Sequence, residues 1–115
     1  MANETILDDT DTVRVVEKLI AATRAGKIVW ETTEFHEVYQ TVFMSGVVLS
    51  RKNGRHGLEI MNSSGDTVLS YYPEGEGRQH MLEQLHHFAH VSALKPRQVL
   101  LDIAREIDEQ LLRKN

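Results

Sequence analysis

Residues 35–72 read FHEVYQTVFMSGVVLSRKNGRHGLEIMNSSGDTVLSYY, and this stretch carries the main architectural signal of the chain. It is rich in valine, tyrosine, phenylalanine and isoleucine, which favour strands, and turn residues interrupt it at short intervals. One of the interruptions is Asn53-Gly54, the preferred pair for a tight hairpin; the others are Ser45-Gly46 and Ser64-Gly65-Asp66. The pattern predicts four consecutive antiparallel strands, at about 35–44, 47–52, 57–62 and 67–72.

Helical patterns flank this predicted meander. Before it, apolar residues recur at helical spacing from Val13 to Ile20, Gly26 suits the left-handed residue that ends a helix, and the β-prone KIVWE would supply a fifth strand. After it, residues 78–92 carry an apolar stripe, and Pro96 fits the first turn of another helix. The apolar positions of that last helix are Val99, Leu100, Ile103, Ala104, Ile107 and Leu111. The predicted class is α+β: an antiparallel β-meander of four to five strands with one N-terminal and two C-terminal helices.

Length and composition indicate one globular domain. The chain has 115 residues, of which 41% are hydrophobic and 26% are charged, and this is enough for one core. Residues 1–11 carry four acids and little to bury. We therefore expect a disordered tail over 1–11 and a single α+β domain over 12–115.

Several classes of protein are excluded by what the sequence lacks. The chain has no cysteine, which excludes disulfides, thiolate metal sites and cysteine nucleophiles. No apolar run approaches the roughly 20 residues of a membrane span, and the acidic N-terminus is unlike a signal peptide, so we expect no membrane partner and a cytoplasmic location. The net charge of −4 argues against general nucleic-acid binding.

The first long strand is apolar on both sides. Val38, Val42 and Met44 alternate with Tyr39 and Phe43, so each face of the strand carries large hydrophobic side chains. A sheet covered by helices on one side alternates apolar with polar residues instead. Either the helices cover both faces or a second subunit covers one of them, and the second alternative predicts self-association.

Four histidines lie in RQHMLEQLHHFAH, residues 78–90. The apolar stripe of this helix centres near Leu85 and Ser92, and the opposite side is expected to carry His80, Glu83, His86, His87 and His90. Spacings of three and four residues would let His86, His87 and His90 bind zinc or nickel, but the segment lacks the HExxH pattern. An outward histidine cluster is most often a solvated surface. We therefore expect no metal and no cofactor.

The remaining candidates are a basic hairpin and a tryptophan. Arg51, Lys52 and Arg55 lie around one turn, where they would form either a phosphate-binding site or an ordinary charged loop tip. Trp30 is expected to be a core residue, with a stacking platform for a base as the alternative. These four residues are the candidates for binding a ligand. No P-loop, nucleophile elbow or paired-acid pattern indicates an enzyme.

Two segments resemble a family of small bacterial proteins that have no assigned activity. KLIAATRAGKIVWE, residues 18–31, resembles the helix and AGKIxWE turn that open those proteins, and residues 82–107 resemble their closing pair of helices. The resemblance implies the same order of elements and an origin among mobile-element or defence-related bacterial genes. It transfers no catalytic residue, and where the family tends to have tyrosine and arginines this chain has His86, Phe88 and His90.

The sequence favours a non-catalytic interaction or regulatory module that acts through protein–protein contact and self-associates. The first alternative is a binder or sequestering protein for a small anionic ligand such as a nucleotide, held by Arg51, Lys52, Arg55 and Trp30. The second is a metal-dependent enzyme that uses the helix histidines.

Overall fold

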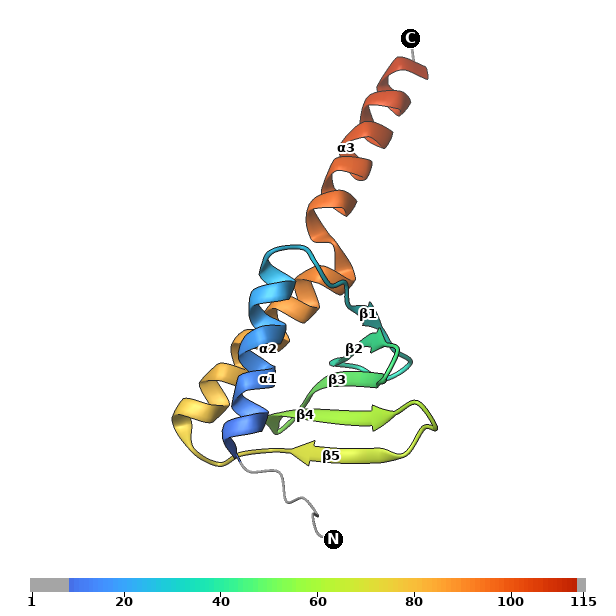
Figure 1. Cartoon of the computed structure of the whole chain (residues 1–115). Coiled ribbons are helices and arrows are strands. Elements are labelled where there is room, and N and C mark those ends of the chain that lie inside the picture. Colours follow the sequence, from blue (N-terminus) through green and yellow to red (C-terminus); the bar gives the residue numbers. More distant parts are fainter. Residues whose placement is uncertain (1–8, 114–115) are drawn as a thin grey trace, which may run out of the picture.

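The computed structural model describes residues 9–113, which form three helices and one sheet (Figure 1). The elements are α1 Asp9–Arg24, β1 Glu31–Thr32, β2 Val38–Phe43, β3 Gly46–Asn53, β4 Arg55–Asn62, β5 Thr67–Tyr71, α2 Glu76–Leu94 and α3 Pro96–Arg113. The predicted α+β class and antiparallel meander are confirmed. The fifth strand, β1, overlaps the expected KIVWE segment only at Glu31, because residues 27–30 form the connection after α1 and not a strand.

The sheet has the simplest topology that the turn signals allow. Its strands are hydrogen-bonded in the order β1-β2-β3-β4-β5, each antiparallel to the next. Gly54, with φ of 79°, occupies the turn between β3 and β4, where a side chain would be strained. The register aligns Tyr39, Ser50, Leu58 and Tyr71 in one row across four strands, so all four lie on the same face.

Helices α1 and α2 pack on that face and build the core with it. The buried hydrophobic cluster consists of Val16, Leu19, Trp30, Tyr39, Val48, Leu58, Leu82, Leu85 and Ala89. No helix within residues 9–113 packs on the opposite face of the sheet, so the alternative that these helices cover both faces is wrong. On that face Val38 is buried beneath the 33–35 loop, whereas Val42 is 61% exposed.

Helix α3 does not join this core. None of its eighteen residues is buried, and it projects away from the rest of the molecule (Figure 1). The two C-terminal helices are separated by Lys95, whose φ of 49° is left-handed. The arm explains why the chain measures 75 × 33 × 25 Å instead of being nearly spherical.

The N-terminal helix begins earlier than expected. Asp9, Thr10 and Asp11 already belong to α1, and the rest of the expected tail, residues 1–8, lies outside the described residues. Over residues 9–113, every helix falls short of the length or apolar character that crossing a membrane requires.

Candidate functional site

The histidine-rich face of α2 is not uniformly solvent-exposed. His86 is only 6% exposed, because α2 packs against the sheet on one flank and against α1 on the other. The buried arc of this helix is therefore wider than its apolar stripe and includes polar positions at its edge. The expectation that His86 faces solvent is wrong, whereas His80 and His87 are exposed as expected.

His86 joins the helix to the sheet through both ring nitrogens. Its Nδ1 lies 3.0 Å from the hydroxyl of Ser50, which is on β3 and only 1% exposed. Its Nε2 lies 2.8 Å from a carboxylate oxygen of Glu37, just before β2. A neutral imidazole that accepts from Ser50 and donates to Glu37 satisfies all three groups at once.

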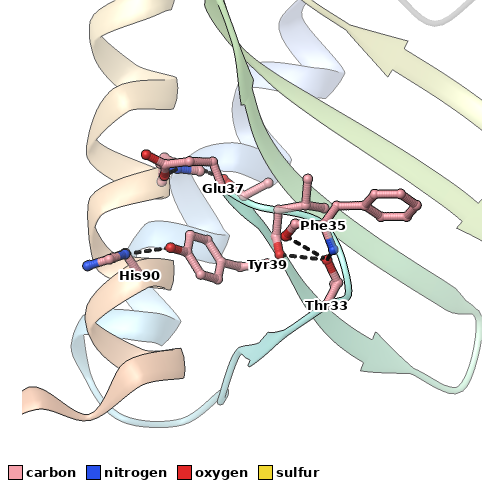
Figure 2. A network of polar contacts seen from close by, with 8 residues as sticks. Thr33, Phe35, Glu37, Tyr39 and His90 are labelled. Carbon is pink, nitrogen blue, oxygen red and sulfur yellow. Dashed lines mark hydrogen bonds and ion pairs between the residues drawn. The ribbon is translucent and has the colours of Figure 1, made fainter.

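A second histidine–sheet contact lies one helical turn further along α2. His90 Nδ1 is 2.5 Å from the hydroxyl of Tyr39, and the two rings are nearly perpendicular with centroids 5.4 Å apart (Figure 2). The ring centroid of His86 lies 5.2 Å from that of Tyr39. It also lies 5.3 Å from the ring centroid of His56 on β4, and these two imidazole rings make an edge contact. Three histidines and a tyrosine therefore form one continuous aromatic group between α2 and the sheet.

The loop before β2 holds Glu37 in place. Glu37 has φ of 60°, an uncommon backbone conformation for a residue with a side chain. The Thr33 hydroxyl donates to the carbonyl of Val38 at 3.0 Å and accepts from the Phe35 amide at 3.1 Å (Figure 2). The Glu37 carbonyl accepts from the amide of Lys52 at 3.2 Å. These bonds fix the strained residue at the position from which its carboxylate reaches His86.

The surroundings lower the pKa values of Glu37 and His56, and both shifts preserve this arrangement near neutral pH. The hydrogen bond from His86 lowers the pKa of Glu37 below its ordinary value of 4.5, against the opposing effect of burial. Burial lowers the pKa of His56 below 6.5, and the nearby His86 lowers it further. Glu37 is therefore kept ionised and His56 neutral.

Ser50, His86 and Glu37 have the same order of groups as a serine–histidine–carboxylate triad. Nucleophilic catalysis requires that a substrate reach the serine oxygen. Because Ser50 is 1% exposed beneath α2, its hydroxyl is closed to a substrate in this structure. The arrangement instead fixes the position and rotation of α2 on the sheet.

Comparison with known proteins adds no relative: no family model matches the chain, and no curated protein or solved structure is significantly similar to it. The assignment of a role therefore depends on the geometry of the chain itself.

The four residues suggested as ligand contacts do not converge. Trp30 is 1% exposed in the core, and its indole donates to the Thr23 hydroxyl at 2.9 Å. Arg51 is 3.5 Å from Glu59 on the uncovered face of the sheet. Arg55 donates to the Tyr72 carbonyl at 3.2 Å and is 3.8 Å from Glu74, while Lys52 is exposed.

The suggested metal ligands likewise lie in different surroundings. His86 is bonded to Ser50 and Glu37, His90 contacts Tyr39, and His87 is exposed beside Phe88. Among residues 9–113, no three histidine, aspartate or glutamate side chains are grouped as metal ligands.

An apolar surface without a packing partner among residues 9–113 lies along one side of α3. Exposed large hydrophobic side chains on this helix are Val99, Leu100, Leu101, Ile103, Ile107, Leu111 and Leu112. Five of the seven lie on one stripe at helical spacing, and only Leu101 and Leu112 lie on the other side. A stripe of this kind normally packs against another element, and in this structure it faces outward.

Sequence reasoning missed Ser50, Glu37 and Tyr39 as partners of the histidines. One signal was available: Ser50 follows Gly46 and Val48 on the face of β3 that packs against the helices. A polar residue at a core-facing position requires a hydrogen-bond partner. A histidine on a helix that packs on this face can be that partner.

Proposed function

We propose that this protein is a non-catalytic interaction module that works as a homo-oligomer and uses α3 as its contact surface. The single observation that carries the proposal is the helix itself: seven large hydrophobic side chains are exposed along eighteen residues and none is buried.

Two physical arguments support this role. Most helical stability in proteins comes from the packing of an apolar face, and none of the residues of α3 is buried within the described chain. Folded monomers also rarely expose a contiguous apolar patch of this kind outside an interaction site. Both arguments favour a partner chain that covers the stripe from Val99 to Leu111.

Sedimentation of the whole chain at micromolar concentration tests the proposal. We expect a mass above the 13.1 kDa of one chain. Ile107→Glu places a charge within the stripe and should shift the protein towards the monomer. The matched control is Leu101→Glu, because Leu101 is exposed to nearly the same extent, 51% against 53%, but lies outside the stripe.

The two variants distinguish a specific contact from general hydrophobic association. If both substitutions dissociate the oligomer equally, the stripe is not the contact surface. A wild-type protein that stays monomeric at all concentrations would overturn the proposal of a homo-oligomer.

A further inference from the structure

An apolar groove lies between α1 and the sheet, with a volume of about 470 Å³. Its walls include Val15, Leu19 and Ala22 of α1 and Phe43, Val48 and Ile60 of the strands. Lys18 is the charged residue that lines it. The groove lies on the helix-covered face of the sheet, at a place where a third helix would complete the layer.

The connection between α2 and α3 keeps the α3 of the same chain from lying along this groove. Helix α1 separates it from α2: Lys18 and Ala22 face the groove, while Arg24 lies over the Phe88 ring of α2 at 5.5 Å on the other flank. Adjacent packed helices are roughly 8–10 Å apart, so the groove is about two helix spacings from α2. A single residue, Lys95, joins α2 to α3, and one residue spans at most about 3.6 Å.

The groove and α3 nevertheless complement each other. The stripe of α3 is continuous and apolar, as the groove is, and Glu106 borders it on one side while the groove offers Lys18. Within residues 9–113, neither Lys18 nor Glu106 has an ion-pair partner. A second helix in the groove would therefore bring opposite charges together at its edge.

We propose that the groove receives α3 of a second copy of this chain, and that two copies exchange these helices reciprocally. The inference rests on the proposed function and specifies where the contact surface docks. Each chain then supplies one stripe and one groove, and both unfilled apolar surfaces of the monomer are covered by the same association.

The extent of the surfaces favours exchange over a simple pairing of two α3 helices. From Val99 to Leu111 the stripe is about 18 Å long, and a helix is about 10 Å wide, so paired stripes cover on the order of 200 Å² per chain. Stable interfaces bury about 800 Å² per partner. Exchange replaces the single helix–helix contact by two helix–groove contacts, which raises the covered area to about 400 Å² per chain. It also covers Val15 and Phe43, which are 40% and 42% exposed.

Because the chain has no cysteine, introduced thiols report directly on the contact. Lys18→Cys and Glu106→Cys are prepared as separate proteins, one of them isotopically labelled, mixed and treated with a bifunctional maleimide. We expect a covalent dimer that contains one labelled and one unlabelled chain. The control replaces Lys18→Cys by Glu17→Cys, which places the thiol on the exposed side of α1 away from the groove.

A second measurement introduces a charged side chain into the apolar groove. Val15→Glu should weaken dimerisation roughly tenfold or more in sedimentation, as removal of a central contact does in other interfaces. The neighbouring exposed residue serves as control, since Arg14→Glu lies outside the groove lining and should leave the dimer intact.

The outcomes separate this inference from the proposed function. If Ile107→Glu dissociates the oligomer but Glu106→Cys links to itself in preference to Lys18→Cys, and Val15→Glu has no effect, the α3 helices pair with each other. Exchange is then overturned, and the proposed function stands. A protein that is monomeric throughout overturns both.

Discussion

His86 and Ser50, thirty-six positions apart in the chain, are joined by a hydrogen bond of 3.0 Å that connects α2 to β3. A second bond of 2.8 Å runs from the same ring to Glu37. The helix is thus attached to two separate segments of the sheet through one side chain. Substitutions at this ring should affect the packing of the whole helix layer.

Replacing His86 by alanine should destabilise the protein by about 1–3 kcal/mol, because Ser50 loses a buried hydrogen-bond partner. His87→Ala is the matched control: the neighbouring side chain is exposed, and its loss should change stability by no more than about 0.5 kcal/mol. Urea unfolding of the two variants measures the difference. Equal effects would mean that the His86 contacts contribute nothing to stability.

The ring of His86 should be the Nε2–H tautomer when it is neutral. In that form Nε2 donates to the Glu37 carboxylate and Nδ1 accepts from the Ser50 hydroxyl, whereas the other tautomer would place the Nε2 lone pair against a carboxylate. Nitrogen chemical shifts of the labelled imidazole at pH 8 distinguish the two forms. A protonated Nδ1 would contradict the arrangement.

Stability should fall in acid in two stages. The folded-state pKa of His56 is lowered, so below its ordinary value near 6.5 the unfolded chain binds a proton that the folded chain does not, and stability decreases as the pH falls. The lowered pKa of Glu37 has the same sign below its ordinary 4.5. Urea midpoints measured from pH 8 to pH 4 report both stages. In His56→Gln the first stage should become smaller, and an unchanged profile would contradict this cause.

The raised pKa of Tyr72 should make the protein less stable as the pH rises into the alkaline range. Burial and the hydrogen bond to Glu59 raise its pKa to about 12, so the folded protein keeps a proton that the unfolded chain loses above its ordinary value of 10. Stability therefore decreases as the pH rises through this range. An absorbance titration of phenolate should lose its last step in Tyr72→Phe. Tyr71→Phe, whose hydroxyl accepts from Arg78 at 3.0 Å, serves as the control.

Alanine substitutions at Gly57 and Gly77 should change the stability of the protein in opposite directions. At Gly57 an added methyl group would lie 1.9 Å from the ring of Tyr72, so Gly57→Ala should destabilise by about 1–3 kcal/mol through overpacking. Gly77 lies in α2 with no atom near the added carbon, and Gly77→Ala should stabilise by up to about 1 kcal/mol through helix propensity. Thermal unfolding compares them. If Gly57→Ala were as stable as the wild type, the ring of Tyr72 could not lie where it does.

The sheet was predictable because its signals are local. Asn53-Gly54 and the β-branched runs on either side fix a hairpin within a few residues, and four of the five strands follow from such patterns. The role of His86 was not predictable in this way. The helical wheel showed where its apolar stripe lies, but the width of the buried arc depends on α1 and the sheet, which pack on α2 from distant parts of the chain.

The same distinction applies to the other candidates. Trp30 could be assigned to the core because a large aromatic residue is usually buried there, and its 1% exposure confirms this. The apolar face of α3 could also be predicted from the sequence, but the periodicity does not indicate which surface that face packs against. Whether that face meets its own chain depends on the direction in which the helix leaves α2.

That direction is set at one residue. Lys95 has φ of 49° and ψ of 55°, and the following Pro96 disfavours the right-handed helical conformation at the residue before it. The two helices therefore cannot merge into one straight rod. Because α3 extends about 27 Å beyond this point, a 20° change in its direction would displace its far end by about 9 Å. A single backbone conformation thus acts as the pivot of a lever, and the stiffness of that pivot determines how precisely the far end of α3 is placed relative to the sheet.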